Sequence, residues 1–164
     1  MMWWDYVLTG ISVLCTVVSI VGAYRANLYY KKSKNISILV KTKDSLSESK
    51  VILESMSEIL KLSNTMLARG KNISKMVSEQ GQIINKALIR IKELEGFADN
   101  KKIDAILKTK DFNAQDYINS LISGKVICDG TICIDNEYTN CYQIFENLQL
   151  FLKQRMEEQE EKLK

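Results

Sequence analysis

The chain has no proline and no histidine among its 164 residues, and it has only seven glycines. Because proline and glycine are the main helix breakers, their scarcity favours long helices over turn-rich sandwich or barrel folds. Histidine is the usual acid–base side chain near neutral pH and the commonest metal ligand. The sequence also lacks a phosphate loop, a Rossmann glycine pattern, a nucleophile elbow and an HExxH motif. We therefore expect no enzyme, no cofactor and no metal site.

A large excess of charge is absent as well. The 23 lysines and arginines are nearly balanced by 20 aspartates and glutamates, which leaves a net charge of +3. Proteins that bind nucleic acid usually carry a dedicated basic surface, and this balance gives no sign of one. We expect no nucleic-acid partner.

One long uncharged run dominates the N-terminal part of the chain, from Tyr6 to Tyr24. At about 1.5 Å per residue it reaches about 28 Å, close to the thickness of the hydrocarbon core of a bilayer. A cleaved signal peptide would have a basic N-terminal region and a small-residue cleavage site, and neither is present. The aromatic and basic flanks argue against a buried helix of a soluble protein. The run predicts a single transmembrane helix, which makes residues 1–30 an anchor in the lipid bilayer.

The residues at the two ends of the run predict its orientation. Aromatic side chains flank it on both sides, as in the interfacial belts of spanning helices. Only Asp5 and the terminal amine precede it, whereas basic residues cluster after it, so the positive-inside rule places the N-terminus outside and the C-terminal domain in the cytoplasm. The basic cluster is also expected to contact anionic lipid. The predicted membrane-interface residues are Trp3, Trp4, Tyr24, Arg25, Tyr29, Tyr30, Lys31, Lys32 and Lys34.

A stripe of small and hydroxyl side chains recurs at spacings of three and four within the run. Such a stripe lets a second helix approach closely and exchange hydrogen bonds across the seam. The alternative is that the hydroxyls bond to carbonyls of their own helix. We expect self-association or docking on a partner transmembrane helix through Thr9, Ser12, Thr16, Ser19 and Ala23.

Residues 31–98 show helical periodicity. Leucines repeat every seven positions and are the predicted helical core or oligomer interface: Leu39, Leu46, Leu53, Leu60 and Leu67. A second apolar register begins at Ile73, after a break at Gly70. A parallel coiled coil would need a second apolar core position in each heptad, but Thr42, Ser49 and Ser63 stand three residues after leucines. We therefore favour a helical hairpin or bundle, with a continuous coiled coil as the alternative.

The sequence predicts a small α+β unit over residues 99–153 and a charged tail over residues 154–164. Two short helices are expected at 102–109 and 114–122, the second capped by Asn113. Asp129-Gly130 predicts a β-hairpin between 126–128 and 131–134, and a closing helix is expected over 138–153. Lysines around 101–110 form a patch for an anionic ligand or a protein, although a solvated helix face is the commoner meaning. The expected fold is mainly α, with a transmembrane helix, a long amphipathic helix or hairpin, and this α+β unit.

Three cysteines near the predicted hairpin form a candidate thiol cluster, Cys128, Cys133 and Cys141. Buried free thiols are the favoured interpretation, because a cytoplasmic domain is kept reduced. A disulfide would require the opposite topology. A zinc site would need an acidic fourth ligand in place of the missing histidine, which structural zinc sites rarely use.

Together these features predict a single-pass, oligomeric, non-enzymatic sensor, effector or adaptor whose cytoplasmic helical domain signals to, or scaffolds at, the membrane. Two other classes fit the same features. One is a structural or assembly subunit of a larger membrane complex. The other is a viral or exported surface protein with its C-terminal part outside and its disulfides formed.

Overall fold

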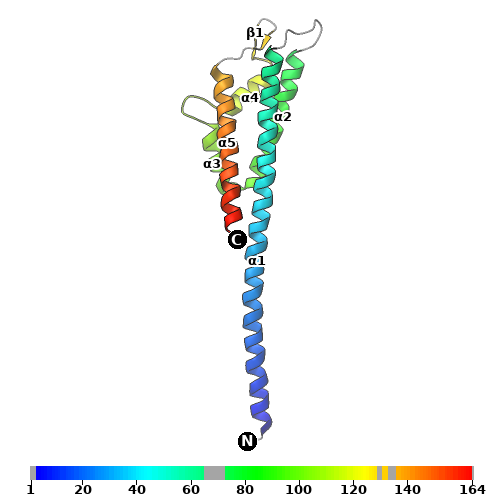
Figure 1. Ribbon diagram of the computed structural model, residues 1–164, viewed down its shortest axis with the longest axis vertical. Coiled ribbons are helices and arrows are strands. Elements are labelled where there is room, and N and C mark those ends of the chain that lie inside the picture. The colour runs from blue at the N-terminus through cyan, green and yellow to red at the C-terminus, as the bar shows by residue number, and fades with distance from the viewer. Residues whose placement is uncertain (1–2, 65–72, 129–130, 133–135, 164) are drawn as a thin grey trace.

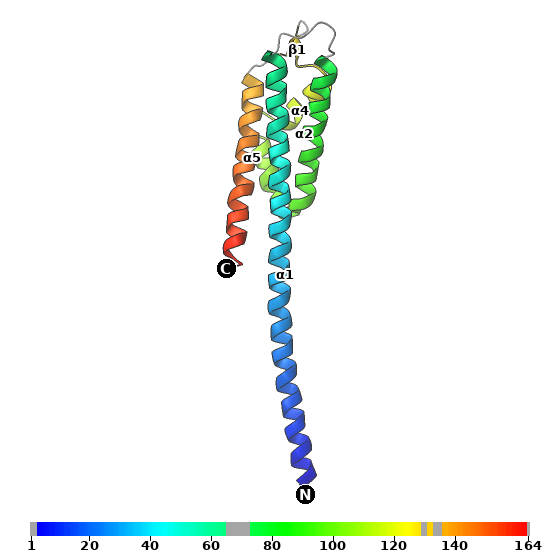
Figure 2. The ribbon, with the colours of Figure 1, turned by 45° about the vertical axis from the view of Figure 1, so that its right-hand side comes forward.

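The computed structural model describes residues 3–64, 73–128, 131–132 and 136–163 (Figure 1). These residues form α1 (Trp3–Asn64), α2 (Ile73–Glu95), α3 (Phe97–Leu107), α4 (Ala114–Ile122), β1 (Ile127–Cys128), β2 (Thr131–Ile132) and α5 (Asn136–Glu161). Helix α1 is 62 residues long and spans about 93 Å. Its C-terminal half lies in a bundle with the other helices, whereas its N-terminal half extends alone from one end of that bundle (Figures 1 and 2).

The bundle is built on α1. Helices α2 and α5 both run antiparallel to α1 and lie beside it, and α3 and α4 complete the bundle against α2 and α5 (Figures 1 and 2). The chain therefore turns back after α1 instead of continuing as a rod. The C-terminus consequently lies at the end of the bundle from which the free half of α1 emerges (Figure 1). We call this end the base of the bundle and the opposite end the tip.

The face of α1 that packs into the bundle follows a three–four spacing. It is polar near the base and apolar toward the tip, where Ile52, Met56 and Ile59 are fully buried. The polar part consists of Thr42, Ser45 and Ser49, which are buried as well. The same core contains apolar side chains of α2, α4 and α5, namely Val77, Ile84, Leu88, Ile91, Ile118, Leu121, Phe145, Leu148 and Leu152.

The leucine heptad flanks this face instead of forming its centre. Leu46 and Leu53 are half-buried at the edge of the core, Leu39 is also half-buried, and Leu60 is exposed. Leu67 lies outside the described residues. Two helices contact α1 from neighbouring sides, so the most buried row lies between them and the leucines stand beside it. A role of the leucines in oligomerisation stays a prediction.

The predicted α+β C-terminal unit with a β-hairpin is wrong. The described part of the C-terminal region is helical, and its extended segments β1 and β2 have two residues each. Ile127 lies opposite Ile132 and Cys128 opposite Thr131. Pairing of this length buries no face of its own and cannot form an independent layer. The segment is a connection between α4 and α5, and the fold is a helical bundle.

The boundaries of α4 agree with the predicted ones, whereas those of α3 and α5 differ from them. Helix α4 covers the predicted residues, and the side chain of Asn113 accepts a hydrogen bond of 3.1 Å from the backbone amide of Gln115, as an N-cap does. Helix α3 begins earlier than predicted, at Phe97, because Gly96 alone makes the break with a φ of 77°. Helix α5 continues to Glu161, so the predicted charged tail is mostly helical.

Candidate membrane-spanning helix and the base of the bundle

The N-terminal part of α1 exposes a continuous apolar surface. The described part of the chain contains one helix that is long and apolar enough to cross a membrane, and the apolar window of that helix has no buried residue. Its exposed apolar side chains are Val7, Leu8, Ile11, Val13, Leu14, Val17, Val18, Ile20 and Val21. A core helix of a soluble protein would cover such a window with other elements. Here the bundle begins only beyond it.

The hydroxyl stripe of this helix is bonded internally where its bonds are described. Thr16 Oγ1 donates to the carbonyl of Ser12 at 2.9 Å, and Ser19 Oγ donates to the carbonyl of Cys15 at 2.8 Å. The donors are thus satisfied within α1, as Ser and Thr in membrane helices often are. The small side chains of the stripe, including the exposed Thr9 and Ala23, would therefore let a second helix pack closely more than they would offer it hydrogen-bond donors. Packing on a second helix stays a prediction.

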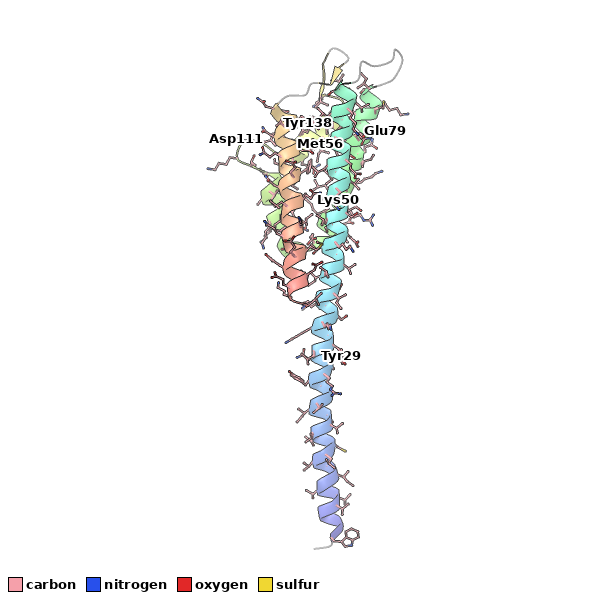
Figure 3. The ribbon with its side chains drawn as sticks, in the orientation of Figure 1. Tyr29, Lys50, Met56, Glu79, Asp111 and Tyr138 are labelled. Atoms are coloured by element: carbon pink, nitrogen blue, oxygen red, sulfur yellow. The ribbon has the colours of Figure 1, made fainter. Side chains whose placement is uncertain are left out.

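A ring of basic and aromatic side chains follows the apolar window, and we call Arg25, Lys31, Lys32 and Lys34 the collar. All four are exposed, as are the neighbouring rings of Tyr24, Tyr29 and Tyr30. Figure 3 places Tyr29 on the free part of α1, below the bundle. Arg25, Leu28, Tyr29 and Lys32 line a shallow hollow of about 450 Å³ on one side of the helix.

At the other end of the apolar window Trp3 is exposed. The side chains of Trp4, Asp5 and Tyr6 lie outside the described part. Exposed aromatic side chains therefore lie at both ends of the window, as the sequence predicts.

Carboxylates are missing from the part of α1 that carries the collar. The sequence has no aspartate or glutamate between Asp5 and Asp44. None of the ion pairs found among the described residues includes a collar side chain. The collar therefore carries four positive charges without a carboxylate partner in the described structure.

The base of the bundle holds a buried ion cluster that joins three helices. Arg155 Nη1 of α5 lies 2.8 Å from Glu95 Oε2 at the end of α2 and 2.7 Å from Asp99 Oδ2 of α3. The Glu95 side chain is 1% exposed and the Arg155 side chain 15%. Removing either partner would leave a charge in a poorly hydrated place, so this contact locks α5 to the α2–α3 corner.

Sequence reasoning missed this cluster, although its signal was present. Glu95 continues the buried spacing of Ile84, Leu88 and Ile91, and Arg155 continues that of Leu148 and Leu152. A charged residue in a buried register predicts a charged partner from another element. The partner itself could not be read from the sequence, because Glu95 and Arg155 lie far apart along the chain.

A hollow of about 160 Å³ lies beside the ion cluster, between α1, α2 and α5. Ile38, Lys41 and Thr42 line it together with Glu95 and Arg155. The Thr42 and Ser45 hydroxyls and the second carboxylate oxygen of Glu95 are buried without a hydrogen-bond partner among the described residues. The base of the bundle therefore contains polar groups whose burial costs stability.

The tip of the bundle contains the described member of the thiol cluster. Cys141 is a free, fully buried thiol, and burial raises its pKa from 9.0 to about 12. A thiol with such a pKa is a poor nucleophile at neutral pH. The side chain of Cys128 and all of Cys133 lie outside the described residues, so the cluster as a whole is not described. Among the described residues no group of three or more potential ligands is arranged to hold a metal ion.

The predicted lysine patch around 101–110 is exposed and partly paired with acids. Lys102 Nζ lies 3.9 Å from Asp99 Oδ1, and Lys92 of α2 pairs with Asp104 at 2.7 Å. Lys101, Lys108 and Lys110 are exposed. The acids interleaved with these lysines fit a solvated helix face better than a site for one anionic ligand.

Comparisons with protein-family models, with curated proteins and with solved structures found no match for this chain.

Proposed function

We propose that this protein is a single-pass, membrane-anchored and non-enzymatic sensor, effector or adaptor, whose helical bundle lies on the cytoplasmic side and acts as an oligomer. One observation carries the proposal. The same helix, α1, provides both the exposed apolar window and the buried Ile52–Met56–Ile59 face of the bundle. The bundle is thus joined to the membrane segment by continuous backbone hydrogen bonding and not by a flexible linker.

The continuity of α1 suggests how a signal would pass. Residues 25–41 contain no glycine or proline, and they are helical throughout. A rotation or tilt of the bundle face of α1 therefore moves the membrane segment as one body. Signals of this kind would enter through the bundle, because α1 has no buried residue before Thr42 among its described side chains.

The raised pKa values of two buried groups fit a non-enzymatic role. The pKa values of Tyr138 and Cys141 are both raised to about 12, chiefly by burial. A catalytic acid or base would have a pKa near the working pH and face a cleft. Both groups are instead buried in the core at the tip of the bundle.

The cytoplasmic placement of the bundle is supported by the asymmetry of charge. The collar stands between the apolar window and the bundle, and basic residues beside a spanning helix favour the cytoplasmic side. The test is labelling of Glu137→Cys with a membrane-impermeant maleimide, in a variant with Cys15, Cys128 and Cys133 replaced by serine. We expect labelling only after permeabilisation, with the buried Cys141 of the parent variant as the unlabelled control. Labelling of intact cells would reverse the topology.

Signal transfer through α1 can be tested with two matched insertions after Lys34. Seven alanines extend the helix by about two turns and keep its phase within about 20°. Seven glycines of the same length break its stiffness. If the protein is an effector, cells expressing the wild type and the alanine insertion become leaky or depolarised under inducing conditions, and cells expressing the glycine insertion do not. Intact membranes with the wild type under every condition would overturn the effector version.

A subunit of a larger membrane complex is the second candidate, and exposed apolar side chains on the bundle favour it. Leu150 is exposed, and with Leu46 and Met156 it lines a hollow of about 440 Å³ between α1 and α5. Ile36 and Val40 are exposed near the base. Native mass measurement after mild detergent extraction separates the candidates. A stoichiometric foreign partner supports the subunit, and a self-oligomer supports the sensor or effector.

A further inference from the structure

We propose that the collar is a binding surface for the headgroups of anionic lipids, in the leaflet on the bundle side of the membrane. The inference rests on the proposed membrane anchoring and adds the class of lipid that the protein selects. Its chemistry is that of phosphate or carboxylate headgroups attracted by one arginine and three lysines.

The height of each collar residue above the apolar window follows from the helix rise. Counted from Tyr24, Arg25 lies within the first turn, and Lys31 and Lys32 lie about 10 to 12 Å along the axis. The headgroup layer is about 5 to 8 Å thick, and the surface potential extends a further Debye length of about 8 Å. Long basic side chains also bend toward the interface. Arg25, Lys31 and Lys32 therefore reach the headgroups, and Lys34 lies at the limit.

The same rise excludes the next two lysines along α1. Lys41 and Lys43 lie about 26 and 29 Å from Tyr24, beyond the reach of the surface potential. Both are exposed, as the collar residues are. They provide a control with lysine side chains on the same helix.

The arrangement around the helix favours several headgroups over a single pocket. Arg25 and Lys32 are seven residues apart and share one face, with Tyr29 between them in the hollow that all three line. Lys31 and Lys34 lie on another side of α1, because each residue turns the helix by about 100°. Cations that surround the helix fit a ring of lipids.

Nearby carboxylates do not compete for the collar in the described structure. Arg155 lies at the level of Ile38 and Thr42, because all three line one hollow. Helix α5 is antiparallel to α1, so Glu158 and Glu161 lie lower, at about the level of residues 34–38. No ion pair joins these acids to the collar among the described residues. Their negative charge instead opposes close approach of the bundle to an anionic leaflet.

The experiment uses the full chain reconstituted in phosphatidylcholine vesicles with a trace of spin-labelled phosphatidylserine or spin-labelled phosphatidylcholine. Electron paramagnetic resonance measures the fraction of each labelled lipid that the protein immobilises. For the wild type we expect phosphatidylserine to be enriched at the protein by at least about twofold, and the enrichment to fall in 1 M salt. In Arg25→Gln/Lys31→Gln/Lys32→Gln the enrichment disappears, and in Lys41→Gln/Lys43→Gln it equals that of the wild type.

Equal immobilisation of the two lipids by the wild type would overturn the proposal. An equal loss of enrichment in the triple variant and in the Lys41/Lys43 control would overturn it too, because a general charge effect would then explain the result. A wild type that immobilises neither lipid, and that alkaline carbonate extracts from vesicles, would refute the anchor itself. That outcome is distinct from a loss of selectivity with the anchor in place. Excess inorganic phosphate should lower the enrichment no more than another salt does at the same ionic strength.

Discussion

The phenol of Tyr138, near the start of α5, donates a hydrogen bond of 2.8 Å to the backbone carbonyl of Met56 in α1 (Figure 3). The bond is buried, and it joins two residues that are far apart along the chain. It fixes the tip of α5 to α1, while the Arg155 cluster fixes the base of α5 to α2 and α3. Helix α5 is therefore held at both ends, and each attachment can be removed separately.

Removal of the Tyr138 hydroxyl should have a modest effect on stability. In Tyr138→Phe the Met56 carbonyl keeps its place within α1, so the loss is that of one buried hydrogen bond. We expect the free energy of unfolding to fall by about 1 kcal/mol, measured by denaturant unfolding in detergent micelles. A loss above about 3 kcal/mol would show that the ring packing has changed as well.

Alkaline pH should destabilise the tip of the bundle through the same residue. Burial, followed by the neighbouring Tyr142 and Cys141, raises the pKa of Tyr138 from 10.0 to about 12. Between these values the unfolded phenol loses its proton and the folded phenol keeps it, so the unfolding free energy falls as pH rises. The stabilisation is complete below pH 10 and is lost by about pH 12. Tyr138→Phe should show a shallower fall in this window, and an unchanged slope would contradict the assignment.

Cys141 should resist modification while the bundle is folded. Its pKa of about 12 and its burial keep the thiol protonated and inaccessible at neutral pH. Mass spectrometry after maleimide treatment should find it labelled only in denaturant. Cys15, which is exposed in the apolar window, provides the comparison in detergent. Rapid labelling of Cys141 under native conditions would show that the tip opens.

Loss of Arg155 should cost far more than loss of an exposed cation. Arg155→Met leaves the nearly inaccessible carboxylate of Glu95 without its partner, and we expect a loss of about 3 to 5 kcal/mol. The control is Lys61→Met, whose ion pair with Glu58 is exposed at both side chains and should be worth below about 1 kcal/mol. The double variant Arg155→Met/Glu95→Met should recover much of the loss. Equal effects of the two single variants would contradict a buried cluster.

Gly81 should not tolerate a side chain. A Cβ at this position would lie 3.0 Å from Ile122 Cγ1 and 3.1 Å from both the Ile122 backbone nitrogen and Leu121 Cβ. Helix α4 thus ends directly against α2, where Ser78 Oγ also donates to the Ile122 carbonyl at 2.8 Å. Gly81→Ala should lower stability by about 1 to 3 kcal/mol, even though alanine favours helix by about 1 kcal/mol. Thermal unfolding tests it, and a stabilised variant would show that α4 can move away.

Replacing buried polar residues at the base with apolar ones should raise the stability of the bundle. Thr42→Val and Ser45→Ala remove buried hydroxyls that have no partner among the described residues, and each should raise stability by about 1 kcal/mol. Ser49→Ala is the control, because the Ser49 hydroxyl bonds to the Leu46 carbonyl at 2.7 Å. If Thr42→Val and Ser45→Ala lower stability, the hydroxyls have partners in the assembled protein.

Much of the local structure could be predicted from the sequence. The uncharged run and the helix capped by Asn113 depend on residues close together along the chain, and local sequence contains that information. The β-hairpin prediction failed because Asp129-Gly130 specifies a turn but not the length of the strands beside it. The leucine heptad was misleading in a similar way, since regular spacing identifies a helix without identifying its most buried face.

Residue types and their spacing are enough to predict an apolar helix near the N-terminus, the basic residues after it, and amphipathic helices over most of the rest. The arrangement of the helices was needed to show that α1 is both the apolar helix and part of the core of the bundle, and that Arg155 meets Glu95 and Asp99. These features differ in the range of the interactions that produce them. Hydrophobic length and helix capping act within a few turns, whereas burial of a charge is settled only when distant helices come together.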